Sequence, residues 1–184
     1  MTFVAGDVTD PDLVSLLRPP YDTLVSFDVI EHVDRYLNFL SNAVALLSDD
    51  GTALIGCPNR WQTFALNQAW NPFHMQEFTP AQLRGLLERF FGSVQVWSQE
   101  MTSPELSVRI RRQRTGSTWR SAARSMLPDW AKTSIKRALR SRGTGGTFSM
   151  TDVQFMEEPG DDALLAAFGL IAVCRQPRRD HPLA

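Results

Sequence analysis

Two apolar runs, YDTLVSF at 21–27 and TALIGC at 52–57, flank a stretch that has a helical repeat. Short apolar runs that end at turn residues are typical of buried strands. In residues 32–48 the apolar side chains recur every three or four positions, which indicates an amphipathic helix. They are Val33, Tyr36, Leu37, Leu40, Val44 and Leu47. Parallel strands need a crossover connection of this kind, so the sequence predicts an α/β fold.

The same alternation continues on both sides of this unit. The further elements that the pattern predicts are strands at 3–6, 93–99 and 170–174, a helix at 10–18, a turn at 48–51, and a helix from Thr79-Pro80 onward. Alternating strands and helices predict a doubly wound, mostly parallel sheet. The last two strands are joined by a long segment without a clear crossover helix, so we expect them to form an antiparallel edge pair.

Composition favours one globular domain. The chain has 184 residues, of which 43% are apolar and 21% charged, as is ordinary for a domain with a hydrophobic core. Both cysteines, Cys57 and Cys174, lie in apolar, strand-like runs. We expect buried free thiols in a reducing compartment, hence a cytoplasmic protein.

The charge is unevenly distributed. Residues 109–142 hold 11 of the 19 Lys and Arg and a single acid, so they carry +10, while the rest of the chain carries −11. We expect residues 103–147 to form a basic helical insertion within a single domain that spans 1–184. Three roles stay open for it: a solvated lid over an acceptor site, contact with an anionic membrane surface through 109–142, or nucleic-acid binding. The interleaved apolar side chains make nucleic acid the weakest of the three.

Three reactive groups follow the run at 21–27. In SFDVIEHVDRY, the side chains of Asp28, Glu31 and His32 have the spacing i, i+3, i+4, which would place them on one face of a helical turn. Asp28 could cap the helix, with Glu31 as its capping-box partner at a pocket rim. His32 could act as a general base, supported by Glu31. All three could also share a divalent cation, although we assign no metal ligand.

Four stretches in this order resemble the class I S-adenosylmethionine-dependent methyltransferases, in the ubiquinone-biosynthesis-like or type 11 or 23 group. They are VAGDVTD (4–10), YDTLVSFDVIEHV (21–33), LLSDDGTALIGCPN (46–59) and NPFHMQEFTPAQLRGLL (71–87). The resemblance covers about residues 3–100 and the last strand, and it implies a Rossmann-like sheet.

The resemblance also implies roles for individual residues. It places Asp7 and Val8 at the adenine of the cofactor S-adenosylmethionine, and Ser26, Phe27 and Asp28 on its methionine side. His74 and Glu77 could close over the acceptor or add ligands to the set of Asp28, Glu31 and His32. The candidates to line an apolar acceptor pocket are Trp61, Trp70 and Phe73. The expected reaction is methyl transfer to a small molecule, at oxygen, with a lipid- or sugar-linked acceptor as one option.

One family feature has no counterpart in this sequence. The first two strands of the family, with the Gly-rich cofactor loop, should precede residues 3–6, and no G-x-G-x-G occurs downstream. We therefore expect an N-terminally truncated sheet, with strands 3–7 present and strands 1–2 absent. Such a fragment would bind the cofactor only if the missing part were supplied. The alternative is a non-catalytic remnant that docks on a partner chain through the exposed edge of strand 21–27 or through the basic insertion.

Overall fold

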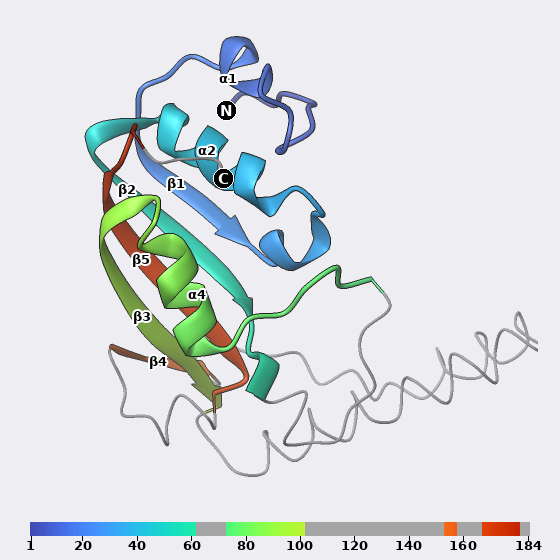
Figure 1. The fold of residues 1–184 in the computed structure, drawn as a ribbon, viewed down its shortest axis with the longest axis vertical. Helices are drawn as coiled ribbons and strands as arrows, with labels where there is room; N and C mark the ends of the chain where they lie inside the picture. Colours follow the sequence, from blue (N-terminus) through green and yellow to red (C-terminus); the bar gives the residue numbers. More distant parts are fainter. Residues whose placement is uncertain (62–72, 102–152, 158–166, 181–184) are drawn as a thin grey trace, which may run out of the picture.

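The computed structural model describes residues 1–61, 73–101, 153–157 and 167–180 (Figure 1). Within them, five strands form one sheet in the order β1-β2-β5-β3-β4. The strands are β1 (Tyr21–Phe27), β2 (Leu47–Pro58), β3 (Phe91–Met101), β4 (Val153–Glu157) and β5 (Gly169–Pro177). The sheet of the family that the sequence resembles has the strand order 3-2-1-4-5-7-6. The order β1-β2-β5-β3 corresponds to its strands 4-5-7-6, so this part of the predicted α/β fold class is confirmed.

Parallel pairing is confined to one strand pair of this sheet. β1 and β2 run parallel, with Ser26 opposite Ile55. β5 runs antiparallel to both β2 and β3, and β4 runs antiparallel to β3. The predicted antiparallel pair of β3 and β5 is therefore confirmed, but its position at the edge is wrong. β5 lies inside the sheet and β4, which the sequence did not predict, follows β3 at the edge.

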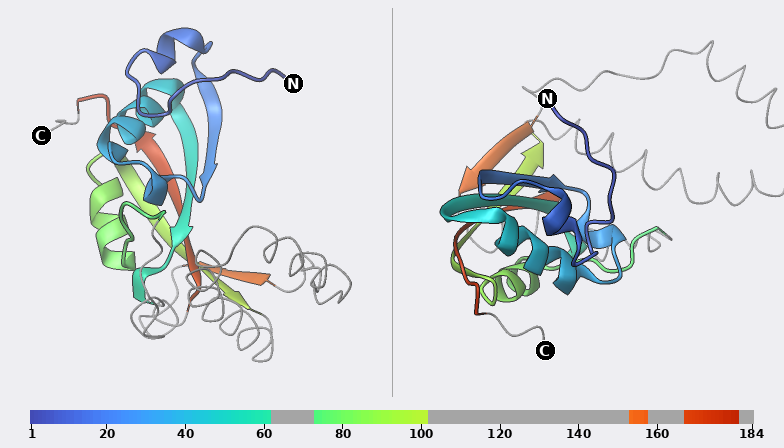
Figure 2. Two further views of the ribbon diagram at one scale, coloured as in Figure 1. Left: turned by 90° about the vertical axis from the view of Figure 1, so that its right-hand side faces the viewer. Right: turned by 90° about the horizontal axis from the view of Figure 1, so that it is seen from above.

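Two helices pack on one face of the sheet. α2 (Tyr36–Leu46) and α4 (Pro80–Leu87) lie on the same side, and no described helix covers the other side (Figure 2). The expectation of a doubly wound, mostly parallel sheet is thus wrong for the described part of the chain, where three of the four strand pairs are antiparallel. The core between helices and sheet consists of aliphatic, aromatic and thiol side chains, which include Phe39, Leu40, Val44, Ile55, Cys57, Leu83, Leu87, Val96, Leu170 and Cys174.

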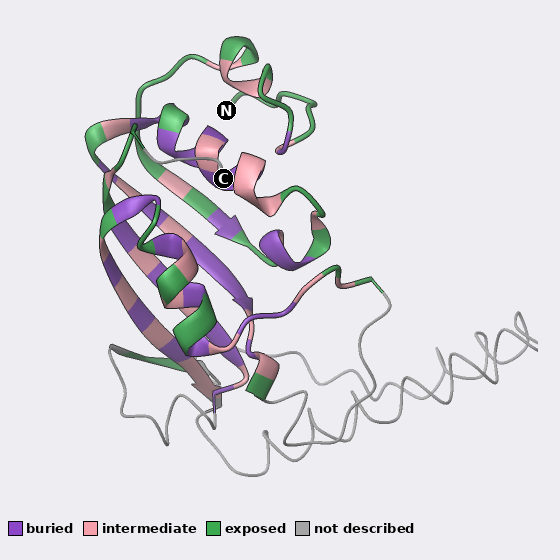
Figure 3. Cartoon of the chain, viewed as in Figure 1, coloured by how far each residue is buried: buried purple, intermediate pink, exposed green. Residues whose placement is uncertain are grey.

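The uncovered face explains why β1 is more exposed than predicted. Tyr21, Val25 and Phe27 are 39, 57 and 48% exposed. Figure 3 shows that most of β1 is not buried, while the second half of β2 beside it is mostly buried. A strand becomes buried on both sides only where elements pack on both faces. Here only the inward side chain of Ser26 is buried.

The segment before β1 is not a strand. Residues 3–6 lie outside the sheet, against the prediction, and are followed by the short helix α1 (Leu13–Leu16). A strand is stable only where a neighbouring strand satisfies its backbone groups, and among the described strands β1 pairs with β2 alone. Asn42 of α2 instead anchors this segment, since its Nδ2 donates to the carbonyl oxygens of Val8 (2.9 Å) and Asp10 (2.7 Å).

The predicted turn at 48–51 lies within β2. Tyr21 pairs with Leu47 and Thr23 with Thr52, so the four residues 48–51 on β2 stand opposite the single residue Asp22 on β1. This shift makes the stretch a bulge inside a longer strand. The predicted insertion at 103–147, with the basic stretch 109–142, lies outside the described residues. No helix that the structure describes is long and apolar enough to cross a membrane.

Candidate functional site

The turn after β1 bends sharply at Asp28. Its φ is 54°, and its backbone N–H donates to the carbonyl oxygen of Gly56 at 3.1 Å. Asp tolerates this left-handed conformation better than most residues. A 3-10 turn, η1 (Ile30–His32), follows, and α2 begins only at Tyr36.

The capping interpretation of Asp28 and Glu31 is therefore wrong. The residues before η1 and α2 are Val29 and Arg35, and neither helix has a side-chain cap. The left-handed turn at Asp28 ends before the helix starts, so its carboxylate is too early in the chain to cap α2. The same turn replaces the regular helical turn on which the i, i+3, i+4 argument rested.

Glu31 is the least expected feature of this turn. Its side chain is 1% exposed, and its Oε2 has no hydrogen-bond partner among the described residues. Burial raises the pKa of the Glu31 carboxyl above its usual range; a backbone hydrogen bond lowers it and the charge of Asp28 raises it. An ionised carboxylate that is buried costs free energy unless hydrogen bonds or an opposite charge compensate for its lost hydration. The ionised form of Glu31 therefore needs a partner at the site.

His32 faces the neighbouring loop. Its Nδ1 lies 2.8 Å from the carbonyl oxygen of Phe73. A carbonyl oxygen only accepts hydrogen bonds, so Nδ1 carries the proton and Nε2 carries the lone pair of the neutral ring. Nε2 lies 3.9 Å from Oε1 of Glu31, and the His32 side chain is 40% exposed. His32 can therefore accept a proton from a molecule that approaches from solvent.

His74 joins the same cluster from the segment before α4. Its ring meets that of His32 edge to face, with centroids 4.9 Å apart. Its Nδ1 lies 2.7 Å from Oε1 of Glu77, and these two side chains are 10 and 3% exposed. One ligand atom each from Glu31, His32 and His74 lies within 4.8 Å of the other two. The residue that lies beside Glu31 and His32 in the structure is thus His74. Asp28, which the local spacing had suggested, is not part of this group.

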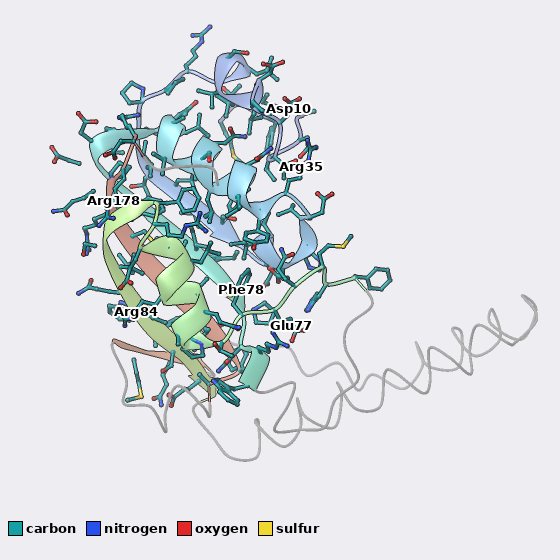
Figure 4. All side chains as sticks on the ribbon, viewed as in Figure 1. Asp10, Arg35, Glu77, Phe78, Arg84 and Arg178 are labelled. Carbon is teal, nitrogen blue, oxygen red and sulfur yellow. The ribbon has the colours of Figure 1, made fainter. Side chains whose placement is uncertain are left out.

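Backbone contacts fix this segment against η1. The N–H groups of Met75 and Gln76 donate to the carbonyl oxygen of Glu31, at 2.7 and 3.4 Å. The Gln76 side chain donates to the carbonyl oxygens of Ile30 and Val33. In Figure 4 the labelled Glu77 and Phe78 lie beside the first turn of α4. The sequence missed Gln76, because a lone Gln in a polar loop carries no distinctive signal.

Asp7 occupies a turn at the start of the chain. Its Oδ1 accepts from the N–H and the hydroxyl of Thr9, both at 2.8 Å, and its Oδ2 lies 3.6 Å from Nη2 of Arg35. The backbone hydrogen bond from Thr9, followed by that from its hydroxyl, holds the pKa of Asp7 below its usual range. The carboxylate is more than half exposed, and Val8 next to it packs partly on the core.

The other candidates for cofactor contact lie at the end of β1. Ser26 is buried and its Oγ has no hydrogen-bond partner in the described part of the chain, while Asp28 is exposed. The Phe27 ring lies against Gly56 of β2, so closely that a side chain there would displace it. Asp7 itself is paired with Arg35, the residue that precedes α2.

The aromatic residues proposed for the acceptor are only partly placed. Trp61 is 42% exposed and its N–H donates to Oδ1 of the buried Asn59. The Phe73 ring is 76% exposed, and it is the carbonyl of this residue that reaches the cluster. Trp70 lies outside the described residues.

Comparison with known proteins finds a family match for part of the chain. Residues 3–90 match the family model described as a methyltransferase domain. The resemblance inferred from the sequence is thereby confirmed, and S-adenosylmethionine is the cofactor of this family. The matched region includes Asp7, the whole turn after β1, and the His74–Glu77 pair.

Several known proteins are similar to this chain. An 86-residue stretch is 36% identical to a probable S-adenosylmethionine-dependent methyltransferase of Mycolicibacterium smegmatis, and covers 45% of this chain and 33% of that protein. A possible histamine N-methyltransferase of Thermotoga maritima superposes with a TM-score of 0.53 and 13% identity, over 93% of this chain and 61% of the other.

A second solved structure gives the same result. A methyltransferase of Archaeoglobus fulgidus superposes with a TM-score of 0.52 and 15% identity, over 93% of this chain and 66% of the other. At these identities the two structures support the fold alone. The chain matches a third of the length of the curated relative and under two thirds of both structures.

Proposed function

We propose that this domain serves S-adenosylmethionine-dependent methyl transfer to a small-molecule acceptor, at an oxygen atom. The observation that carries the proposal is the meeting of Glu31, His32 and His74 at the carboxyl ends of β1 and β2, inside the region that matches the family. Ligands of open α/β sheets bind at this end of the strands.

The residues at this end suit a cationic cofactor. S-adenosylmethionine, when bound, supplies a methyl group that is already activated by its positively charged sulfur. The carboxylates of Asp7 and Asp28 are both exposed and favour a positive ligand by electrostatic attraction. Oδ2 of Asp7 keeps acceptor capacity for an amino group, since Thr9 uses only Oδ1. Backbone groups at Ser26 and Phe27 would complete the contact.

His32 is the proposed general base. Its Nε2 holds the lone pair, its ring is oriented by the Phe73 carbonyl, and it is open to solvent. The carboxylate of Glu31, at 3.9 Å, stabilises the imidazolium that forms when His32 takes the acceptor's proton. The acceptor would contact His74 and the aromatic side chains of Trp61, Trp70 and Phe73. An apolar lipid- or sugar-linked acceptor fits those aromatic rings.

Calorimetric titration with S-adenosylhomocysteine, on the chain joined to the first two strands and Gly-rich loop of a related methyltransferase, tests the cofactor site. We expect Asp7→Ala to weaken binding at least about tenfold, which corresponds to one or two lost hydrogen bonds to a charged group. Asp22→Asn is the matched control, because Asp22 is an exposed carboxylate at the opposite end of β1. Equal binding by the Asp7 variant and the wild type would refute the assignment of this residue.

One observation favours a second function, a non-catalytic interaction module. β1 pairs with β2 alone among the described strands, and it exposes Val25 and Phe27. An open, apolar strand edge invites pairing with another chain. Sedimentation of the wild type and of Val25→Lys tests this: a complex that the charge abolishes supports the module. The basic stretch 109–142 stays a candidate for an anionic membrane surface, to be tested with phosphatidylserine vesicles.

A further inference from the structure

We propose that the side of the sheet opposite α2 and α4 is the interface of a homodimer, where it packs on the same side of a second copy of this chain. The inference goes beyond the proposed function, because it concerns the flat side of the sheet and not the carboxyl ends of its strands. It also differs from pairing at the open edge of β1, since most of the side chains involved belong to strands inside the sheet.

The alternation of side chains along each strand defines this side of the sheet. Ile55 of β2 and Ala172 of β5 belong to the core, which lies between the sheet and the helices. Successive side chains of a strand point to opposite faces, so Leu54, Ile171 and Val173 point away from the helices. No described helix covers them there (Figure 2).

Two neighbouring rows on this side are apolar. Each row runs across the sheet through residues that are paired in register. The first row is Val25, Leu54 and Val173, and the second is Phe27, Gly56, Ile171 and Trp97. Val25 and Phe27 are about half exposed, and the larger side chains on the inner strands are half-buried. We call the two rows together the apolar face.

Polar residues border the apolar face. One further row, before Val25, consists of Thr23, Thr52, Arg175 and Ser93. On β3, Gln95 and Gln99 flank Trp97 on the same side of the sheet. An apolar centre with a polar rim is the usual anatomy of a protein–protein interface.

The absence of charge favours a second copy as the partner. In a two-fold interface the same surface patch meets itself, so a charged residue at its centre would approach its own like charge. None of the residues in the two apolar rows is charged. Two identical apolar faces can therefore meet without electrostatic repulsion, and the charge of Arg175 stays at the rim.

The size of this side of the sheet also fits a dimer. Four strands about 4.8 Å apart, over the length of residues 93–99, cover roughly 450 Å² in projection. Protruding side chains give such a face more accessible surface than its projection, and a standard interface buries about 800 Å² on each partner. Flat sheets pack on one another about 10 Å apart. We therefore expect a dimer with a dissociation constant in the micromolar range, at the weak end for interfaces of standard size.

Sedimentation velocity of the full chain tests the proposal. We expect a dimer at about 50 µM that dissociates on dilution, as a micromolar dissociation constant requires. Val173→Lys should weaken dimerisation at least about tenfold, because each copy would bring a charge into the apolar contact. Val173 lies on β5, inside the sheet, so the variant leaves pairing at the edge of β1 unchanged. A dimer that Val173→Lys does not weaken would overturn the proposal.

Ala81→Lys is the matched control, because it adds the same charge at an exposed position of α4, on the other side of the sheet. It should dimerise like the wild type, and an equal loss in both variants would also refute the interface. If Val173→Lys fails to fold, Leu54→Lys replaces it, since β2 lies inside the sheet as well. A wild type that stays monomeric at about 50 µM, with a Tm independent of its concentration, rules out the dimer. No methyl transfer is measured, so the dimer and the proposed function can fail separately.

Discussion

The Nδ2 group of Asn42 donates to the carbonyl oxygen of Val8 at 2.9 Å, and so attaches the start of the chain to α2. The same group donates to the carbonyl of Asp10 at 2.7 Å. Asn42 is 7% exposed, so both bonds are largely shielded from water. They determine where Asp7, the candidate cofactor residue, lies relative to the end of β1.

Replacement of this amide should loosen the N-terminal segment. We expect Asn42→Leu to lower the free energy of unfolding by about 1–3 kcal/mol, since two carbonyls lose their donor, and to weaken S-adenosylhomocysteine binding. Urea denaturation and calorimetry measure the two effects. Ser41→Ala is the control, because its hydroxyl bonds only within α2, to Leu37. Equal stability of the two variants would contradict this role for Asn42.

Gly56 is required by its contact with Phe27. A Cβ at Gly56 would lie well inside van der Waals distance of the Phe27 ring. We expect Gly56→Ala to destabilise the fold by about 1–3 kcal/mol, as overpacking does, and to displace the end of β1. Chemical denaturation measures it. Gly85→Ala in α4, where a Cβ meets no described atom within 4 Å, should instead stabilise by about 0.5–1 kcal/mol.

The Phe27 ring is half exposed, so it can move aside. The double variant Gly56→Ala/Phe27→Ala should therefore recover most of the loss. A double variant that is as unstable as the sum of its single changes would show that the strain lies in the backbone.

The start of α4 is held by a reciprocal cap. The hydroxyl of Thr79 accepts from the N–H of Gln82, and the Gln82 side chain accepts from the N–H of Thr79. We expect Thr79→Ala to cost about 1 kcal/mol in unfolding free energy, while Thr79→Ser costs little. Loss of stability in the Ser variant would contradict the hydrogen-bond explanation.

Local patterns predicted the elements whose apolar side chains are buried on one side of the sheet. β2, β3 and β5 follow the predicted runs, and α4 begins where Thr79-Pro80 indicated. The run at 3–6 failed because an apolar stretch becomes a strand only beside another strand. β4 went unnoticed because it is short and its described side chains, such as Phe155, are exposed.

The candidate site, too, was only partly predictable from local sequence patterns. The pairing of Glu31 with His32 could be seen from their adjacency, and His74 from the family resemblance. Their meeting depends on contacts such as that between His32 and Phe73, 41 residues apart in the sequence. Spacing within one turn suggested Asp28 instead, because an ideal helix was assumed where the backbone is left-handed.

The two cysteines should be inert in the folded protein. Burial raises the pKa of Cys174 to about 12, and burial together with the charges of Glu31, Asp28 and Glu77 raises that of Cys57. Only the thiolate reacts, so we expect labelling by a disulfide reagent at pH 8 to be at least about a hundredfold slower than in 6 M guanidinium chloride. Cys57→Ser and Cys174→Ser assign the remaining reactivity. Rapid labelling of the native wild type would contradict the burial of both thiols.

The acidity of Asp7 gives a pH prediction with a defined sign. Its folded pKa lies below the ordinary value of 3.8, so the carboxylate stabilises the fold above pH 3.8, and that stabilisation is lost as the pH falls through the folded pKa. A 13C titration of the carboxyl carbon measures the value directly. Thr9→Val removes the hydroxyl donor but keeps the N–H, so it should raise the pKa of Asp7 only part of the way to 3.8. Arg35→Gln should raise it less, because the charge of Arg35 at 3.6 Å is the smallest of the causes. A larger rise in the Arg35 variant than in the Thr9 variant would mean that the ion pair, and not the turn, controls this carboxylate.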